Sequence, residues 1–396
     1  MNSLPRARGW AVVVLIALGA AVAQAFGRFT YGVLLPAIRN DLDHSNTVAG
    51  FLGTANVAAY LFGTLVVASL TSRVKLLTVL RCGFVFSLGG LALATVAPNA
   101  AVLSFALFLM GLGGAFIWIP SPAIAARAVG DHRRGVAVGL MGAGIGVGIV
   151  FSGQLARVLR ERSGDGAWRD LYRVEVAIAL VVVVAIVLFV RHREAPPSGA
   201  RGTGIGVATL RQMPGWAALT GAYAAFGFCY ILAVSFLTSR LEDDSAFSEG
   251  LASTMFTLVG LGSITGGVLL GLAADRIGER ITLTIGFASF ALALAGIMTG
   301  AVAAVAVGSV VVGVMFSGLA STITGYVVRT TTPATFGASF AATTFAFGIA
   351  QVSAPQIGGL VADLTGSFTM VFVLSMVFAV AGAIASSRLP AHDARV

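Results

Sequence analysis

One arginine lies inside a long apolar run, where its charge is costly. Arg28 follows Gly27 in a run that extends from about residue 10 to residue 38, long enough to span a membrane. A charge in the middle of a membrane helix costs at least about 2.5–3.5 kcal/mol, so Arg28 must face protein or an aqueous cavity. A guanidinium stays protonated and binds carboxylate or phosphate through paired hydrogen bonds. Arg28 therefore predicts an anionic substrate group, with a purely structural arginine as the alternative.

Other polar side chains in apolar runs could line the same pathway. Gln24, Arg28 and Tyr31 are four and three residues apart, as Asn56 and Tyr60 are four apart, so each set lies along one side of a helix. Each residue could equally serve as a hydrogen-bond partner between helices. The predicted substrate-binding set is Arg28, Gln24, Tyr31, Asn56, Tyr60, Trp118, Gln154, Tyr223, Tyr230, Tyr326, Gln351 and Gln356.

Acidic and metal-binding residues are scarce within the apolar runs. Asp41, Glu175, Asp275 and Asp363 all fall at or near predicted helix ends, so we expect no carboxylate deep in a span. Beside a buried arginine, that expectation favours an anionic or neutral solute over a cation. The four histidines lie far apart in loops and the two cysteines lie in apolar runs, which predicts neither a metal site nor a cofactor.

The elements that must position these residues are membrane helices. The chain has 396 residues, of which 57% are hydrophobic and only 10% charged, far from the composition of a soluble domain. The apolar runs are continuous rather than alternating, which favours helices over a barrel. Twelve spans are predicted at residues 10–38, 47–70, 76–97, 100–126, 135–158, 171–190, 215–239, 249–272, 281–300, 303–328, 335–360 and 368–388.

The second half of the chain repeats the first. Ala25-Phe26-Gly27 returns as Ala225-Phe226-Gly227, and Gly63 returns as Gly266. Gly111 and Arg127 return as Gly313 and Arg329. We therefore expect an all-α membrane protein with two pseudo-symmetric halves of six helices, residues 1–190 and 215–396, joined by a polar linker at 191–214. Arg28 is asymmetric, since its equivalent in the repeat is Phe228.

The distribution of basic residues predicts the orientation. Most of the 25 lysines and arginines fall on one set of loops if both termini lie on the same side. This positive-inside bias places both termini in the cytoplasm and gives the net charge of +9 a topological role instead of a nucleic-acid-binding one. The arginine-rich loop from Arg157 to Glu175 is expected to be a solvated face of mutually paired charges.

One loop identifies a family. The segment Gly271-Leu-Ala-Ala-Asp275-Arg276-Ile-Gly278-Glu279-Arg280 closely resembles the signature loop of the major facilitator superfamily, and the helix count and duplication extend the likeness to the whole chain. The resemblance implies a latch that closes the cytoplasmic side. Its predicted gating residues are Gly271, Asp275, Arg276, Gly278, Arg280, Arg127 and Arg329.

The likeness has limits. In the first half, Ser72 stands where the repeat has Asp275, so the two loops need not latch alike. The fifth span has glycines at 139, 142, 144, 146 and 148 but no proline, so the exchanger branch of the superfamily is not implied. Gly27-Arg28-Phe29-Thr30-Tyr31 is also similar to a branch of mostly uncharacterised bacterial permeases, which names no substrate.

These features predict a monomeric inner-membrane transporter, not an enzyme, that works by alternating access. Its partners would be membrane lipid and a small solute, an anion such as a monocarboxylate or an aromatic acid, with no nucleic acid. One rival is a polyspecific efflux pump for apolar compounds, which the 26 phenylalanines would suit. A membrane-embedded enzyme would need a nucleophile–base pair or metal cluster, and a non-transporting receptor would be expected to carry a signalling domain. Import or export, and any coupling ion, remain open.

Overall fold

The computed structural model describes residues 6–70, 73–129, 134–190 and 206–390. Every regular element within these ranges is a helix. Within the described residues, twelve helical segments are long and apolar enough to cross a membrane, in agreement with the predicted number. Six of them precede residue 190 and six follow residue 215, as the duplication requires.

The helices of the first half form six spans. The first span is continuous but changes its winding twice, whereas the fourth is interrupted at Ile119 and Pro120, after the last residue of α5. The short 3-10 turn η3 precedes the sixth span. The elements are α1 (Arg6–Ala20), η1 (Ala21–Phe29), α2 (Thr30–Asp41), α3 (Asn46–Leu70), α4 (Leu76–Ala94), α5 (Ala100–Trp118), α6 (Ser121–Val129), α7 (Arg134–Ser163), η3 (Asp165–Ala167) and α8 (Trp168–Phe189).

Before the second half, the polar linker contains a short helix, α9, that the sequence did not predict. Gly278 separates α11 from α12 within the signature loop. Its φ of +79° is a backbone conformation that glycine adopts without strain. The elements are α9 (Val207–Leu210), α10 (Trp216–Ser239), η4 (Arg240–Asp244), α11 (Glu249–Ile277), α12 (Glu279–Met298), α13 (Val302–Thr330), α14 (Pro333–Thr365) and α15 (Thr369–Ser387).

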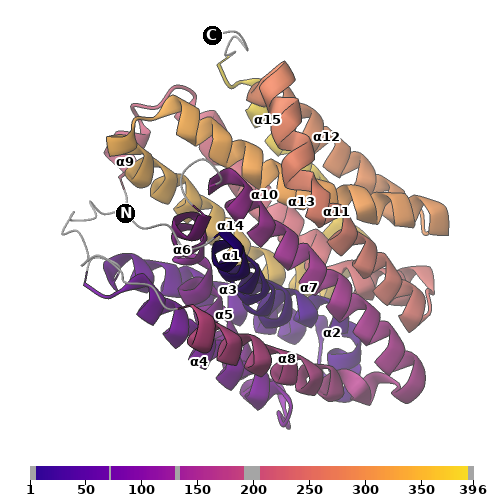
Figure 1. The fold of residues 1–396 in the computed structure, drawn as a ribbon. Helices are drawn as coiled ribbons and strands as arrows, with labels where there is room; N and C mark the ends of the chain where they lie inside the picture. Colours follow the sequence, from indigo (N-terminus) through magenta and orange to yellow (C-terminus); the bar gives the residue numbers. More distant parts are fainter. Residues whose placement is uncertain (1–5, 71–72, 130–133, 191–205, 391–396) are drawn as a thin grey trace.

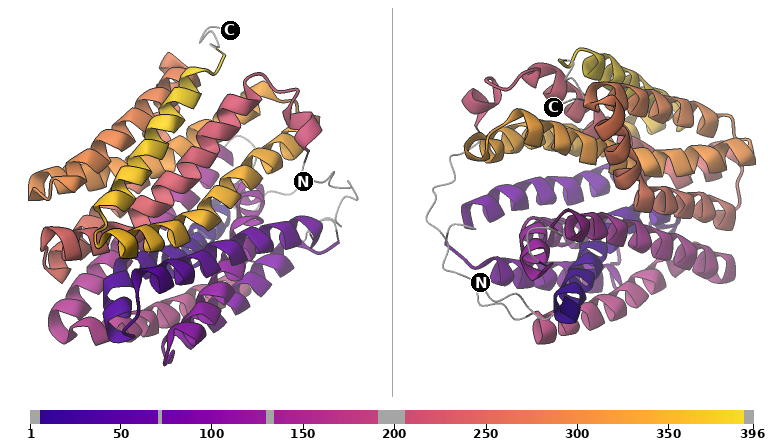
Figure 2. Two further views of the ribbon diagram at one scale, coloured as in Figure 1. Left: turned by 180° about the vertical axis from the view of Figure 1, so that it is seen from behind. Right: turned by 45° about the horizontal axis from the view of Figure 1, so that its top comes forward.

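The two halves lie side by side (Figures 1 and 2), the first in indigo to magenta and the second in rose to yellow. Among the described helices, the main contacts between the halves are those of α3 with α14, α7 with α11, and α2 with α10. Because the spans alternate in direction, the loops fall on two faces. We call the face with residues 42–45, 164–167, 245–248 and 366–368 the loop face. The opposite face, with residues 206–215 and 278, is the linker face.

Equivalent glycines hold equivalent helices together in the two halves. A Cβ atom at Gly111 of α5 would lie 2.1 Å from the carbonyl oxygen of Asn56 in α3. At the repeat-related Gly313 of α13, it would lie 2.0 Å from the carbonyl oxygen of Val259 in α11. Only glycine permits backbones to approach so closely, which is how helices pack where lipid replaces water. The internal repeat of the sequence is thus a repeat of packing.

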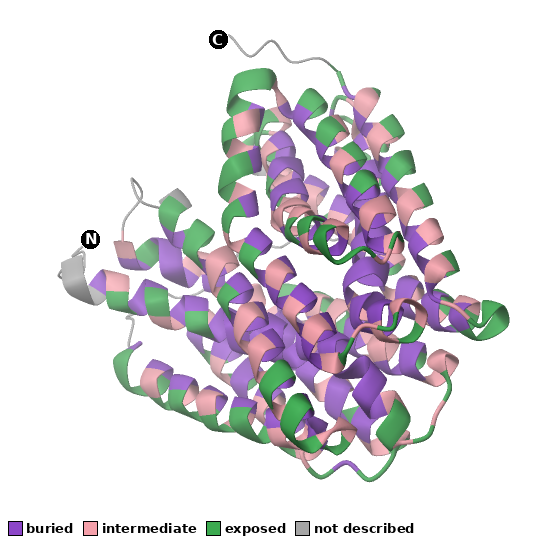
Figure 3. Ribbon diagram, turned by 90° about the vertical axis from the view of Figure 1, so that its right-hand side faces the viewer, coloured by how far each residue is buried: buried purple, intermediate pink, exposed green. Residues whose placement is uncertain are grey.

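The first span contains an unusual π-helical stretch. In η1 the helix is wound more widely over nine residues, and the N–H of Thr30 reaches the carbonyl of Ala25, five residues earlier. Stretches of this kind are rare and occur often at functional sites. Arg28 lies in the last turn of η1. Figure 3 shows buried residues gathered in the interior and exposed ones along the outer surfaces, where many are large and apolar, as suits contact with lipid.

Candidate functional site

Arg28 is placed between the two halves with part of its guanidinium unpaired. Its Nε and Nη2 atoms are buried and have no hydrogen-bond partner. The guanidinium carbon lies 5.5 Å from the ring centre of Tyr60 and 5.9 Å from that of Phe29, within range for cation–π attraction. Two aromatic faces therefore stabilise the charge, and hydrogen-bond donors remain available.

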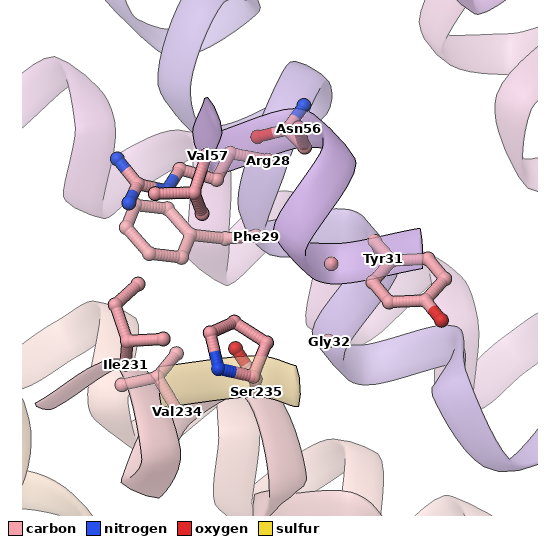
Figure 4. A pocket seen from close by; sticks show the side chains of 11 residues that line it. Arg28, Phe29, Tyr31, Gly32, Asn56, Val57, Ile231, Val234 and Ser235 are labelled. Carbon is pink, nitrogen blue, oxygen red and sulfur yellow. The ribbon is translucent and has the colours of Figure 1, made fainter. Parts of the chain in front are cut away.

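Arg28 lines a small cavity between the two halves (Figure 4), with a volume of about 20 Å³. Arg28, Phe29 and Asn56 lie on one side, and Ile231 and Val234 of α10 face them from the other half. A volume of this size holds about one water molecule. In this conformation the cavity is therefore too small for an organic acid. Its lining is Arg28, Phe29, Tyr31, Gly32, Gly53, Asn56, Val57, Ile231, Val234, Ser235 and Pro355.

Asn56 holds the π-helical segment in place. Its Nδ2 donates hydrogen bonds of 2.8 Å to the carbonyl of Gly27 in η1 and of 2.8 Å to that of Leu107 in α5. Its Oδ1 is buried and has no donor. Tyr31 is tied down as well, since its hydroxyl donates to the carbonyl of Ala49 at 2.8 Å. Both residues line the cavity, but their polar atoms largely serve the helices around it.

Aromatic rings in contact with one another extend from this cavity into the second half, where Tyr223, Phe226, Tyr230 and Phe347 are roughly parallel. The ring of Tyr223 stacks on Phe347 at 4.2 Å, and that of Phe226 stacks on Tyr230 at 4.9 Å. Phe316 lies 5.1 Å from Tyr230 and, in the other direction, 5.4 Å from Phe29 beside Arg28. Rings from both halves thus form a continuous contact that ends at the guanidinium.

The remaining predicted residues divide into two groups. Gln351 donates from its Nε2 to the hydroxyl of Tyr230, and Gln24 is buried near Tyr60, against Gly114. The first group is thus Gln24, Tyr60, Tyr230 and Gln351, which lie close to Arg28 or to the aromatic rings. Other predicted residues serve elsewhere: Gln154 bonds Thr257 of α11, Tyr326 bonds the Pro214 carbonyl at the linker face, Gln356 packs near Gly50, and Trp118 packs at the end of α5.

The loop face is fastened by ion pairs that cross between the halves. Arg39 contacts Asp243 through two hydrogen bonds, of 2.5 and 3.0 Å. Arg160 contacts Glu242 through two more, of 2.6 and 2.9 Å, and Asp165 of its own half at 2.7 Å. In the part of the chain that the structure describes, every ion pair that joins the halves lies at this face. The loop face is therefore closed.

Arg160 corrects the expectation of a fully solvated loop. The pairs Arg157–Glu161 and Arg173–Asp170 are exposed, as expected. The side chain of Arg160, by contrast, is only 1% exposed and holds the two halves together. Spacing along the sequence can predict ion pairs only within one loop, whereas the partner of Arg160 is 82 residues away, in the other half.

The predicted gating residues meet only in part. Arg329 at the end of α13 pairs with Glu279 and lies 3.8 Å from Asp275, so the signature loop contacts a helix of its own half. Arg276 and Arg280 are exposed, as is Arg127 at the end of α6, and a Cβ atom at Gly271 would meet no neighbour. Glu279, which is buried, was missing from the predicted set. Ser72, in the first-half loop, lies outside the described residues.

Glu175 contradicts the expectation that no carboxylate lies deep in a span. It is fully buried in α8, two turns from the start of the helix, and its Oε1 accepts hydrogen bonds from Thr30 at 2.6 Å and Ser152 at 2.7 Å. The signal in the sequence is its spacing. Glu175 is seven and three residues after Trp168 and Tyr172, which puts all three on the buried face of one helix.

Comparison with known proteins identifies the family. The family model described as "Uncharacterised MFS-type transporter YbfB" matches residues 20–387 of this chain, nearly its whole length. The chain belongs to the major facilitator superfamily. Its members are transporters of small molecules rather than enzymes, and the described residues contain no cluster of three or more side chains that could hold a metal ion.

Three curated relatives to which this major facilitator protein is similar are distant. The "Probable actinorhodin transporter" of Streptomyces coelicolor is 26% identical over 48% of this chain, and the match spans only 33% of that protein. "Uncharacterized MFS-type transporter YtbD" of Bacillus subtilis is 24% identical over 65% of each chain. "Inner membrane transport protein YdhP" of Escherichia coli is 25% identical over 64% of this chain and 66% of its own.

Two solved transporters share the fold. The nucleoside transporter NupG superimposes with a TM-score of 0.77 over 96% of this chain and 98% of its own, at 11% identity. A bacterial homologue of the human lysosomal transporter Spinster, in an inward-facing and unoccupied conformation, gives 0.72 over 97% and 98%, at 14% identity. At these identities the likeness establishes the fold, and the substrate must be argued from this chain's own residues.

Proposed function

We propose that this protein transports a small organic anion, such as a monocarboxylate or an aromatic acid, across the bacterial inner membrane by alternating access. The observation that carries the proposal is the unpaired guanidinium of Arg28 between the halves. Its Nε and Nη2 have no partner, and no described carboxylate lies within ion-pairing distance of it. A buried charged donor left without an acceptor costs more than the roughly 1–3 kcal/mol of a neutral one, and a substrate carboxylate would remove that cost.

The aromatic surroundings of Arg28 favour an anion with a flat apolar body. Tyr60 and Phe29 flank the guanidinium, and Tyr230 and Phe316 continue the ring contacts into the second half. Aromatic pairs contribute about 0.5–1.5 kcal/mol beyond the area that they bury. An aromatic carboxylate would use both features, its acid group on Arg28 and its ring against these side chains, which is why it is preferred to a small aliphatic acid.

Transport would require the halves to rock about this site. The cavity of about 20 Å³ must enlarge before an organic acid can enter, and the loop-face pairs Arg39–Asp243 and Arg160–Glu242 hold the present state. In the proposed cycle these pairs break when the loop face opens, while contacts of the signature loop around Asp275 and Arg276 close the linker face. The halves 1–190 and 215–396 would move as units, in a monomer whose linker face is cytoplasmic because the basic residues favour that side.

The rival function is polyspecific efflux of apolar compounds, which the same aromatic rings favour. The two differ in their dependence on charge. A greasy pocket binds neutral compounds whether or not Arg28 is present, whereas an anion site fails without it. Arg28→Lys tests in addition whether the substrate needs two parallel hydrogen bonds, because lysine keeps the positive charge but lacks the planar guanidinium.

The test is a set of ligand-binding measurements on purified protein in detergent. Melting temperatures would be recorded with benzoate, acetate, nicotinate, glucose, alanine and tetraphenylphosphonium for wild type, Arg28→Ala and Arg28→Lys. The matched control is Arg157→Ala, which removes a positive charge at the exposed pair with Glu161. A ligand at ten times its Kd stabilises the protein by about 1.4 kcal/mol, enough to raise the melting temperature measurably.

We expect benzoate or nicotinate to stabilise wild type and Arg157→Ala, to fail with Arg28→Ala and to act weakly with Arg28→Lys. Uptake of the radiolabelled acid into proteoliposomes should follow the same order. Stabilisation by tetraphenylphosphonium in all four proteins, without any effect of the acids, would overturn the anion proposal in favour of efflux.

A further inference from the structure

The buried carboxyl of Glu175 is built into a hydroxyl cluster that the anion proposal does not use. It lies within the first half, between α8, α7 and the first span, and the side chain is fully buried. Its Oε1 accepts from two hydroxyls, Thr30 and Ser152, and its Oε2 has no donor at all. Oε1 thus accepts two hydrogen bonds and Oε2 accepts none. This arrangement is uneven for a carboxylate, whose charge is shared by both oxygens.

No described cation compensates this carboxyl. The titratable groups nearest to it are phenols: Tyr172 on α8 itself, and Tyr31 of α2, which is in electrostatic contact with Tyr172. The groups on α4 that can carry a charge are Arg81 and Cys82, both near its linker-face end, whereas Glu175 lies toward the loop face. On α7, Arg157 and Arg160 pair with Glu161 and Glu242, and the nearby Arg28 of η1 contacts Tyr60 and Phe29.

An ionised carboxylate without a cation is expensive inside a protein. The effective penalty is several kcal/mol per ion even after the surroundings relax, and buried charges in native proteins are paired or coordinated for this reason. The neutral acid avoids this cost, and its unpartnered oxygen is then a hydroxyl that lacks only one hydrogen bond. The geometry around Glu175 therefore suits a carboxyl that holds a proton in this conformation.

The hydroxyl of Thr30 connects Glu175 to the segment that carries Arg28. A threonine hydroxyl has a single proton to donate, and three acceptors compete for it: Glu175 Oε1 at 2.6 Å, Ser152 Oγ at 2.9 Å and the Ala25 carbonyl at 3.3 Å. Ala25 belongs to η1, and its carbonyl also accepts the N–H that closes the last π turn. Arg28 lies between these two residues.

We propose that Glu175 is a proton-binding site of this transporter, separate from the Arg28 cavity, and that its protonation state controls the π-helical segment on which Arg28 is mounted. When Glu175 is neutral, its Oε1 attracts the Thr30 proton less strongly, so the proton is shared with the Ala25 carbonyl and supports the π turn. When the carboxyl O–H bond breaks and the proton leaves to water, the charged oxygen attracts the Thr30 proton more strongly, because hydrogen bonds to ions are about twice as strong as neutral ones. The π turn then loses a contact.

The proton site stands by itself, whereas its consequence for transport rests on the proposed anion function. If Arg28 binds the substrate, release of the proton from Glu175 loosens the segment that presents the guanidinium. Proton occupancy and anion binding would then favour each other across a distance, through Thr30, with no ion pair between Glu175 and Arg28. Glu175 is in this sense a positioning residue for Arg28.

The test needs no substrate. Infrared spectra of the purified protein between pH 5 and pH 10 report the carbonyl band of a protonated carboxyl, and Glu175→Gln assigns that band. Hydrogen exchange, followed by mass spectrometry on peptides covering residues 21–30, reports the π turn, with a peptide from α12 correcting for the intrinsic effect of pH. Thr30→Val removes the hydroxyl that reaches both Glu175 and the Ala25 carbonyl. Ser152→Ala is the matched control, because Ser152 donates to the same oxygen of Glu175 but belongs to α7.

We expect an acid band in wild type that is lost as the pH rises and is absent in Glu175→Gln. Exchange in residues 21–30 should increase about five-fold over the same interval in wild type and Ser152→Ala, because one hydrogen bond contributes about 1 kcal/mol. It should stay constant in Glu175→Gln. In Thr30→Val the band should still titrate while the exchange no longer follows it.

Two results would overturn the inference. One is the absence at every pH of a band that Glu175→Gln removes, since Glu175 would then be permanently ionised. The other is an exchange profile of Glu175→Gln or Thr30→Val that matches wild type, since the proton would then have no effect on the segment. Neither readout depends on anion binding, so failure of the benzoate experiment leaves this test intact.

Discussion

Replacing Glu242 by glutamine should weaken the closed loop face. Glu242 belongs to the second half and accepts two hydrogen bonds from Arg160 of the first, at 2.6 and 2.9 Å. The side chains are 12% and 1% exposed, so the pair is largely shielded from water. Glutamine keeps the shape of the side chain but removes its charge, leaving Arg160 with Asp165 as its closest acidic partner, at 2.7 Å.

The size of the effect follows from these contacts. Removing one partner of a buried ion pair costs about 3–5 kcal/mol when the other charge is left uncompensated. Here Asp165 still compensates Arg160, and the glutamine oxygen still accepts one weaker bond, so about 2 kcal/mol is a reasonable loss. That free energy is gained only when the halves meet at the loop face. The ratio of closed to open molecules should therefore fall about 30-fold, at 1.4 kcal/mol per factor of ten.

Distances between spin labels across the loop face measure this ratio. Arg162 of α7 and Leu364 of α14 are both exposed near that face and would carry the labels as cysteines, in a background without the exposed Cys82. In Glu242→Gln a population with a longer distance should grow at the expense of the closed one. The control is Asp170→Asn, which breaks an exposed pair inside the first half and should change nothing, because such pairs contribute about 0–1 kcal/mol.

A distance distribution in Glu242→Gln that matches wild type would refute the reasoning, since the Arg160 pair would then not hold the halves together. An equal shift in Asp170→Asn would refute it differently, by showing that any loss of charge near the loop face opens it.

Three further predictions concern stability and closure. Gly111→Ala should lower the melting temperature, at a cost of about 1–3 kcal/mol, because its Cβ would lie 2.1 Å from the Asn56 carbonyl oxygen, whereas Gly89→Ala meets no neighbour and should be neutral or stabilising. Asp363→Asn should open the loop face in the same spin-label assay by a smaller amount, about 0.5–1 kcal/mol, since this carboxylate accepts two backbone N–H groups at the start of α3. Burial, and to a lesser degree a nearby arginine, lower the pKa of His44 in the folded protein. The unfolded chain therefore binds the proton more readily, and the stability of the folded protein should fall as the pH drops below about 6.5. Melting temperatures recorded against pH should fall less steeply in His44→Asn.

The architecture could be predicted because it depends on local properties of the chain. Twelve apolar runs and repeated glycines at an offset of about 200 residues are enough to define two similar bundles, and the structure contains both. Where the boundaries differ, the cause is local too. The fourth span is interrupted beside Pro120, and a short helix, α9, begins within the polar linker.

The chemistry at the interface was harder to predict, because its partners are distant in sequence. Arg28 stands out because a charge in an apolar run is unusual, whereas Arg160 is hidden among other charges and gains its role only from a glutamate in the other half. Glu175 was assigned to the loop because charged residues precede it, although its spacing to Tyr172 places it on the buried face. The π-helical winding of η1 has no signal in the residue types. The side-chain hydrogen bonds that reach its carbonyls come from Asn56 in α3 and from Thr30 directly after it.

The matched pair Gly111 and Gly313 has a consequence for how the two halves of the molecule can change independently. Each lies against a carbonyl of the neighbouring helix in its own half, at nearly the same separation. The helix packing of the two halves has therefore stayed alike since the duplication. Arg28 and Phe228, by contrast, occupy equivalent places with opposite chemistry. After duplication, one copy could be modified for recognition while the glycine contacts kept both copies foldable. Descendants with new cargoes should therefore differ first along the opening span of each half and last at these glycines.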